Sequence, residues 1–162
     1  MPRTLYVLTG RSCAGKSTIA RALHRQCAAA VIDLDALNVA KGLPAKSGIS
    51  TTEWSKTYDV VDQAIFDRLS ENRDVVVDWT NFSDWHRERW RTAASTVGAN
   101  TRVLYLPLDL DEQLRRHEAM ISQGQPVLPL PVLQRSNAMF VPPTGANVIT
   151  ITADTEVCRV IS

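Results

Sequence analysis

The stretch "LTGRSCAGKST", residues 8–18, carries the pattern G-x-x-x-x-G-K-[ST] at positions 10–17. An apolar run, "TLYVLT" (4–9), precedes it and predicts a buried strand, and a helical pattern over 16–30 follows it. Glycines let the backbone curl so that successive N–H groups point inward, and the helix adds the positive end of its dipole. The stretch therefore predicts a phosphate-binding loop between a strand and a helix.

Individual positions of this loop have predicted roles in binding ATP and Mg²⁺. Lys16 can reach the β- and γ-phosphates and is a catalytic candidate, and Ser17 can offer its hydroxyl oxygen to Mg²⁺. We interpret Cys13 as a residue that fills the loop rather than as a redox sensor. The predicted nucleotide-binding residues of the loop are Gly10, Arg11, Ser12, Cys13, Ala14, Gly15, Lys16, Ser17 and Thr18.

The composition is that of a single globular domain. The chain has 162 residues, of which 44% are hydrophobic and 22% charged. A formal net charge of +1 does not favour nucleic acid as a partner, although a local basic groove is compatible with it. Three cysteines form neither a disulfide framework nor a metal-ligand cluster, and no run of about 18 apolar residues suits a membrane. We therefore expect a cytoplasmic protein without a membrane span.

Apolar β-rich runs alternate with helical patterns along the chain. The expected strands are 4–9, 30–35, 74–79, 102–106 and 147–152, and the expected helices are 16–30, 51–72, 83–98 and 109–124. Such alternation predicts an α/β fold in which a parallel sheet has helices on both faces.

Two segments lack a clear helical or strand pattern. Residues 36–52 contain Gly42, Pro44 and Gly48 and are expected to form a mobile substrate loop. Residues 125–146 hold five of the eight prolines, so we expect broken regular structure there. Because catalytic lids commonly order on ligand binding, this segment is predicted to belong to a lid over about 112–143.

Acidic residues follow the second and third expected strands. Asp33 and Asp35 end "AVIDLD", and we prefer Asp35 as the base that takes a hydroxyl proton, because it lies further beyond the strand. Asp33 stays open as the alternative base. Asp78 closes the apolar run "VVVDW" and is predicted to organise Mg²⁺, and Thr80 and Asn81 are predicted to contact the substrate.

The chain resembles the small P-loop kinases related to phage-type polynucleotide kinase and zeta toxin. The resemblance rests on "GRSCAGKS", "DLDALN", "VVVDWTNFSDWHRERW", "VLYLPLDLDEQLRRH" and "FVPP", which are spread over nearly the whole chain. It implies that the aspartate after the second strand, here Asp35, activates the acceptor hydroxyl. The segment "DLDALN" is also similar to the D-G-D-x-x-R segment of adenylyl-sulfate kinases, with Asn38 at the arginine position.

The same resemblance implies an arginine-bearing lid after the fourth strand. Of the candidates Arg115 and Arg116 we prefer Arg116, as a residue that contacts the nucleotide and stabilises the transferring phosphoryl group. Met120 stands where relatives often have a second lid arginine, and Arg135 is the candidate to replace it. By analogy with the fold, residues 153–155 are expected near the adenine.

The sequence as a whole predicts a single-domain P-loop kinase, a three-layer α/β sandwich with strand order 2-3-1-4-5. We expect it to transfer the γ-phosphate of ATP to a hydroxyl of a small molecule, a nucleoside or a nucleic-acid end. The alternative is a nucleotide-binding ATPase or switch without an acceptor.

Residues outside these motifs are interpreted as structural. The histidines, among them His86 and His117, are expected on helix surfaces, and Arg87, Arg89 and Arg91 are expected to form a solvated helix face. The four tryptophans are mostly assigned to packing, with a pocket role for Trp54 and Tyr58 held as a minor alternative.

Overall fold

Five parallel strands form one sheet in the order β2-β3-β1-β4-β5, which confirms the predicted strand order. The computed structural model describes residues 3–44 and 46–152. The strands are β1 (Thr4–Thr9), β2 (Ala30–Asp33), β3 (Val75–Asp78), β4 (Asn100–Tyr105) and β5 (Val148–Thr150). Because every neighbouring pair is parallel, the carboxyl ends of all five strands lie at one edge of the sheet.

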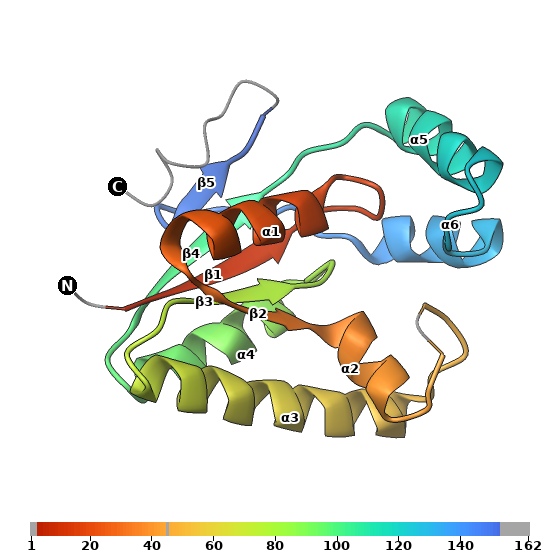
Figure 1. Ribbon diagram of the computed structural model, residues 1–162. Helices are drawn as coiled ribbons and strands as arrows, with labels where there is room; N and C mark the ends of the chain where they lie inside the picture. The colour runs from red at the N-terminus through yellow and green to blue at the C-terminus, as the bar shows by residue number, and fades with distance from the viewer. Residues whose placement is uncertain (1–2, 45, 153–162) are drawn as a thin grey trace.

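Helices cover both faces of this sheet, as Figure 1 shows, and complete three layers. The helices are α1 (Lys16–Cys27), α2 (Leu34–Ala40), α3 (Thr51–Ser70), α4 (Asp84–Ser95), α5 (Leu110–Ser122) and α6 (Leu130–Met139). Helix α1 lies on one face, and α3 and α4 lie side by side on the other. Helices α5 and α6 stand beyond the carboxyl edge, next to the loop between β1 and α1.

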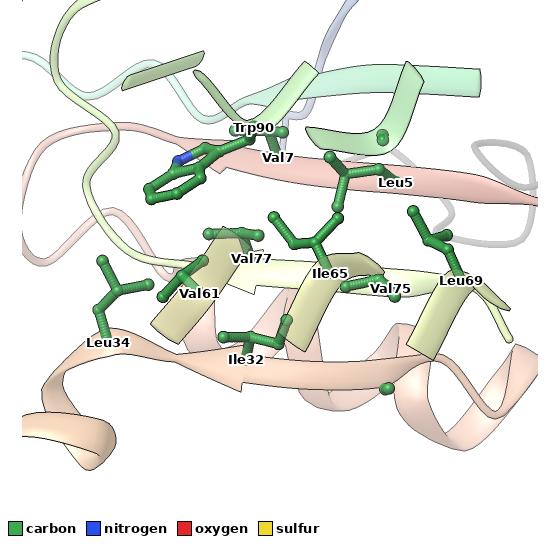
Figure 2. Packing of buried hydrophobic residues seen from close by; sticks show 12 residues of the cluster. Leu5, Val7, Ile32, Leu34, Val61, Ile65, Leu69, Val75, Val77 and Trp90 are labelled. Atoms are coloured by element: carbon green, nitrogen blue, oxygen red, sulfur yellow. The ribbon is translucent and has the colours of Figure 1, made fainter. Parts of the chain in front are cut away.

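The core divides into two clusters because side chains alternate across the strands. Leu5 and Val7 of β1 face α3 and α4, where they pack with Ile65 and Trp90 (Figure 2). Tyr6 and Leu8 point to the opposite face and pack with Leu23 of α1 and neighbouring residues. All of these side chains are almost completely buried. The core therefore fixes β1 from both sides and holds the loop that follows it.

The predicted mobile loop over residues 36–52 is wrong in its first part, because residues 34–40 form helix α2. Strand β2 ends at Asp33, whose carboxylate caps α2 by accepting a hydrogen bond of 3.0 Å from the Ala36 N–H. Leu34 and Asn38, four residues apart, are buried on the inner side of the helix. The helix-breaking Gly42 lies after the helix, so it ends this element and does not prevent it.

Residues 125–146 also contain more regular structure than predicted, because α6 lies within them. Pro129 is the N-cap of α6 and Pro131 lies in its first turn, where a missing N–H costs no helical hydrogen bond. Pro126 precedes the helix, and Pro142 and Pro143 follow it. The prolines thus bracket a helix where a broken segment was expected.

Two smaller features complete the fold. None of the described helices is long and apolar enough to cross a membrane. Cys13 and Cys27, the cysteines within the described residues, are both free thiols.

Candidate active site

A cavity of about 560 Å³ opens at the carboxyl edge of the sheet. Its wall is formed by the phosphate loop, by the residues that follow β2 and β3, by the start of α3, and by α5, α6 and their connection. Most of the residues predicted for the site line it, namely Ser12, Cys13, Gly15, Lys16, Ser17, Thr18, Asp33, Asp35, Asp78 and Thr80. Segments far apart in the sequence therefore meet in one concave site.

The phosphate loop is held close to β4, and its first glycine is required by this approach. A Cβ atom at Gly10 would lie 2.8 Å from the Leu106 carbonyl oxygen, well inside van der Waals contact. The Gly10 N–H donates to the Thr80 carbonyl at 3.2 Å, which ties the loop to the end of β3. Cys13 and Gly15 have left-handed backbone angles, with φ of 69° and 94°. The turn thus has the curled backbone that an anion nest needs.

Lys16 lies across this loop. Its ammonium donates to the carbonyl oxygens of Gly10 and Arg11, at 3.0 and 2.8 Å. Although the residue keeps some exposure, protein atoms surround the ammonium, and this burial lowers the Lys16 pKa to about 8 against the attraction of Asp78. A bound phosphate would give this ammonium a negatively charged partner in place of the neutral carbonyl oxygens.

Asp78 lies beside Ser17 at the floor of the cavity. Asp78 is only 7% exposed, and burial raises its pKa, while a hydrogen bond with Ser17 and the charge of Lys16 act in the opposite direction. A hydroxyl and a carboxylate are the oxygen ligands that Mg²⁺ accepts when substrate phosphates and water complete its shell. Among the described residues no cluster of three or more His, Cys, Asp or Glu could hold a metal alone. The pair Ser17 and Asp78 therefore fits a Mg²⁺ that arrives with the nucleotide.

Asp33 and Asp35 differ in what occupies their carboxylates. Asp33 caps α2, whereas Asp35, in the first turn of α2, forms an ion pair of 3.2 Å with Lys46. Burial raises the Asp35 pKa, and Lys46 opposes that shift. The Asp35 side chain keeps 31% of its exposure and lines the cavity. Because Asp35 caps no helix and is partly exposed in the cavity, its carboxylate is better placed than that of Asp33 to contact a ligand.

Thr80 and Asn81 separate in the structure. Thr80 lines the cavity, but Asn81 is fully buried behind it. The Asn81 amide donates to the Leu8 carbonyl at 2.6 Å, and its carbonyl oxygen accepts from Trp90 Nε1 at 2.7 Å. Asn81 also has a left-handed φ of 46°. The Asn81 side chain therefore connects β1, the turn after β3 and α4 by hydrogen bonds. It does not line the cavity, so the predicted substrate contact of Asn81 is wrong.

The predicted lid arginines also have different positions. Arg116 of α5 donates to the Cys13 carbonyl of the phosphate loop at 3.2 Å and to Glu112 at 2.7 Å. Gln113, one turn earlier and fully buried, donates to the Ser12 carbonyl at 3.0 Å. Neither Arg116 nor Arg135 is among the described residues that line the cavity. Of the two candidates, Arg116 on α5 contacts the phosphate loop, whereas Arg135 on α6 is exposed.

Besides Arg116, three predicted nucleotide contacts in the phosphate loop lie outside the cavity wall. Gly10 and Ala14 shape the loop from behind, and the Arg11 guanidinium donates to the Leu108 carbonyl at 2.9 Å and lies 5.1 Å from the Phe140 ring centre. These contacts tie the loop to the chain segments on either side of the lid helices. Residues 153–155, expected near the adenine, lie outside the described part of the chain.

Sequence reasoning found the aromatic part of the site only in part, because it held a pocket role for Trp54 and Tyr58 as a minor alternative and assigned Trp79 to packing. Trp54 of α3 and Trp79 and Phe82 after β3 line the cavity, and we call these three residues the aromatic wall. The Trp54 and Trp79 rings are 4.9 Å apart between centres, and Trp79 and Phe82 are 5.7 Å apart. The dense aromatic content of "DWTNFSDW" was a signal, but periodicity could not tell cavity-facing rings from core rings.

Two histidines expected on helix surfaces, His86 of α4 and His117 of α5, and Arg87 of α4 are buried instead. His86 and His117 are each 5% exposed, and His86 is bonded to the Ser83 hydroxyl at 2.7 Å and to the Tyr58 hydroxyl at 3.2 Å. Burial lowers the His86 pKa to about 4, so this imidazole is neutral. Arg87 is likewise buried and donates to the Asn81 carbonyl at 2.8 Å. His86 and Arg87 therefore support the turn that carries Trp79 and Phe82.

A family model described as "AAA domain" matches residues 5–143. No curated protein sequence matches the chain significantly. Solved structures show the same fold. An APS kinase from Mycobacterium tuberculosis, in complex with AMPPNP and APS, superposes with a TM-score of 0.72 at 17% identity, covering 99% of this chain and 96% of that chain.

Two further structures extend the likeness. A gluconokinase from Sinorhizobium meliloti 1021 has a TM-score of 0.66 at 20% identity, covering 99% of this chain and 87% of its own. A chain of the Pnkp1/Rnl/Hen1 RNA repair complex has a TM-score of 0.73 at 19% identity over 85% of this chain, which corresponds to 44% of that longer chain. The fold is therefore that of the small P-loop kinases.

Proposed function

This chain belongs to the AAA domain family matched over residues 5–143, and we propose that it is an ATP-dependent kinase that phosphorylates a hydroxyl group. One observation carries the proposal: a single cavity is lined both by a phosphate loop and by carboxylates that follow β2 and β3. The phosphate loop supplies a place for the nucleotide, and the carboxylates supply a base. Solved kinases of the same fold support the reaction class.

The phosphate loop would hold the β- and γ-phosphates. Its inward N–H groups and the N-terminus of α1 attract the anion, and Lys16 exchanges its carbonyl partners on Gly10 and Arg11 for phosphate oxygens. Ser17 and Asp78 would hold Mg²⁺ together with the phosphates. When bound, Mg²⁺ neutralises charge on the phosphoryl oxygens.

Asp35 would accept the proton of the acceptor hydroxyl. Burial raises its pKa and makes the carboxylate a stronger base than an exposed aspartate, while the Lys46 ion pair favours its ionised form. Lys46 holds this carboxylate in the structure without ligand, at 3.2 Å. We infer that the acceptor hydroxyl approaches the Oδ1 oxygen of Asp35 while Lys46 stays paired with Oδ2.

Arg116 would stabilise the transferring phosphoryl group from the lid side. Its guanidinium already lies on the phosphate loop, through the Cys13 carbonyl, and is fixed by Glu112. A guanidinium in that place can stabilise the negative charge on the transferring phosphoryl oxygens and the charge that builds up on the leaving oxygen of ADP. The alternative is an ATPase or switch without an acceptor. That function would need neither the aromatic wall as a binding surface nor Asp35 as a base for an acceptor hydroxyl.

The test is a labelling experiment with ATP radiolabelled at the γ-phosphate, Mg²⁺ and a broad set of hydroxyl compounds, including sugars, sugar acids, nucleosides and oligonucleotides with a 5′-hydroxyl. We expect a labelled phosphomonoester from the wild type and none from Lys16→Ala, in which folding is checked by circular dichroism. Release of inorganic phosphate alone, with every acceptor, would support the ATPase alternative and overturn the kinase proposal.

A further inference from the structure

The aromatic wall of the cavity is a continuous surface of three rings at the carboxylate end of the sheet. Trp79 directly follows Asp78, and Trp54 packs against Trp79 at 4.9 Å between ring centres. Each of the three side chains is half-buried and lines the cavity. Rings that are packed on one side and open to a cavity on the other present a flat apolar surface at which a ligand ring can stack.

A second layer of side chains holds this wall rigid. Tyr58 packs against Trp54, Trp79 and Trp90, at 5.7, 5.8 and 5.9 Å between ring centres. The neutral His86 ring lies 5.1 Å from Trp79 and 4.5 Å from Phe82, and its nitrogens are bonded to Tyr58 and Ser83. Preorganised rings lose little conformational freedom when a ligand stacks on them. The wall is therefore built as a binding surface.

The charges around the wall do not favour an anionic acceptor. The cations among the described residues that line the cavity are Lys16, Arg21 and Lys46, and the carboxylates are Asp33, Asp35 and Asp78. Lys16 belongs to the phosphate loop, and Arg21 lies on α1 with a hydrogen bond to Thr18. Lys46 is already paired with Asp35. Arg21 is the one arginine among the described residues that line the cavity, so with Lys46 held by Asp35 a carboxylate, sulfate or phosphate on the acceptor would meet Asp33 and Asp35 without a free matching cation.

The lid segments also contribute apolar groups to the cavity, beside the polar residues Gln125 and Ser136. Pro126, Val127, Leu128 and Val132, from the connection between α5 and α6 and from α6, line the same cavity, together with Met120. A flat ring could lie between these aliphatic groups and the aromatic wall with its apolar faces covered.

We propose that the acceptor is an uncharged compound that carries its reacting hydroxyl on or next to a flat unsaturated ring, such as a nucleoside, and that the aromatic wall stacks on this ring. The proposal rests on the kinase function proposed above and specifies its substrate class. In the reaction the γ-phosphorus to oxygen bond of ATP breaks, a bond from that phosphorus to the acceptor oxygen forms, the hydroxyl proton passes to Asp35, and ADP leaves.

The test compares uncharged ring-bearing acceptors with charged relatives that carry the same ring. Thymidine and adenosine are paired with their 3′-monophosphates, phenyl glucoside with the corresponding glucuronide, and gluconate serves as an anion without a ring. We expect transfer to the uncharged ring compounds with a kcat/KM at least about tenfold above that of each charged partner. Transfer to the anions in preference would overturn the assignment and leave the kinase proposal standing. Transfer to none of the compounds, here and in the broad set, would overturn both.

The acceptor KM of variants in the aromatic wall provides a second test of the proposal. Trp54→Ala should raise the KM for the ring acceptor about 5- to 100-fold, the range expected for loss of one stacking partner, while the KM for ATP changes less than about twofold. Trp54→Phe should restore most of the affinity. Trp85→Ala is the matched control, because Trp85 is 56% exposed and does not line the cavity. Equal acceptor KM values for Trp54→Ala and Trp85→Ala, in proteins with unchanged circular dichroism, would contradict the stacking role.

Discussion

At the scale of single residues, Lys16 has the most informative environment. Its ammonium is bonded only to neutral carbonyls, and burial lowers its pKa to about 8. A bound triphosphate would place negative charge beside the ammonium and raise that pKa again. Nucleotide binding should therefore be coupled to proton uptake at alkaline pH.

We expect ATP binding at pH 8.5 to take up a substantial fraction of one proton, because part of the Lys16 population is neutral before binding and charged afterwards. At this pH the terminal phosphate is already fully ionised. Calorimetric titrations in buffers with different ionisation enthalpies measure the uptake directly, and ATP affinity should fall as the pH rises from 8 to 10.

Lys16→Met is the control for that titration. This variant should bind ATP much more weakly and should show no proton uptake at pH 8.5. The same uptake in the wild type and the variant would assign the proton to another group, and zero uptake in the wild type would contradict the lowered pKa.

The choice of catalytic base is a second prediction at this scale. Asp35→Asn should lower the transfer rate by about 10²–10⁴-fold with little change in ATP affinity, because a general base contributes about that factor. Asp33→Asn should have the smaller effect, since asparagine caps a helix about as well as aspartate and Asp33 is engaged in capping α2. Steady-state kinetics of both variants decide the point; the larger loss from Asp33→Asn would make Asp33 the base.

At the scale of elements, the lid is joined to the phosphate loop through one buried side chain. Gln113 donates to the Ser12 carbonyl at 3.0 Å and to the Asn137 side chain at 3.2 Å, and accepts from Asn137 at 2.6 Å. The contacts link α5, α6 and the loop. A change in the loop on nucleotide binding can therefore reach both lid helices.

Gln113→Leu should loosen this lid. The substitution leaves the Ser12 carbonyl and the Asn137 side chain without their partner, so amide hydrogen exchange over residues 110–139 should become faster. A non-hydrolysable ATP analogue should slow exchange over the same residues in the wild type, and less so in the variant. Gln123→Ala is the control, because Gln123 is exposed at the end of α5. Identical exchange in Gln113→Leu and Gln123→Ala would contradict the link.

The elements also show what sequence could and could not predict. The phosphate loop and the helices expected from about 83 and 109 follow from local signals that lie within a few residues of one another, whereas the strand order was predicted together with the P-loop kinase fold. Helix α2 was missed although the Asp33 cap is a local signal, because the burial of Asn38 against Thr57 that holds the short helix depends on contact with α3. Helix α6 was missed because prolines at a helix start resemble prolines that break one.

At the scale of the whole molecule, the site lowers the stability of the fold that holds it. Burial raises the pKa of Asp78, so the folded state binds a proton on this carboxyl at higher pH than the unfolded state does. The stability associated with the protonated form is complete below the unfolded value of about 4 and is lost as the pH rises through the raised folded pKa.

Asp78→Asn should therefore raise the melting temperature by a few degrees at pH 7, although it impairs Mg²⁺-dependent activity. The gain should shrink as the pH falls, and it should vanish below about pH 4, where the wild-type carboxyl is protonated as well. Thermal unfolding at a series of pH values tests this. A gain that is independent of pH, or a loss at pH 7, would contradict the raised pKa.

The central claim is that the γ-phosphate moves to a hydroxyl rather than to water, and phosphorus NMR of the turnover mixture tests it most directly. With ATP, Mg²⁺ and an uncharged ring-bearing acceptor such as thymidine, we predict that a phosphomonoester signal grows in step with the loss of ATP, and that it is absent without acceptor or with Asp35→Asn. A signal of inorganic phosphate that grows at the same rate with and without every acceptor would contradict the account.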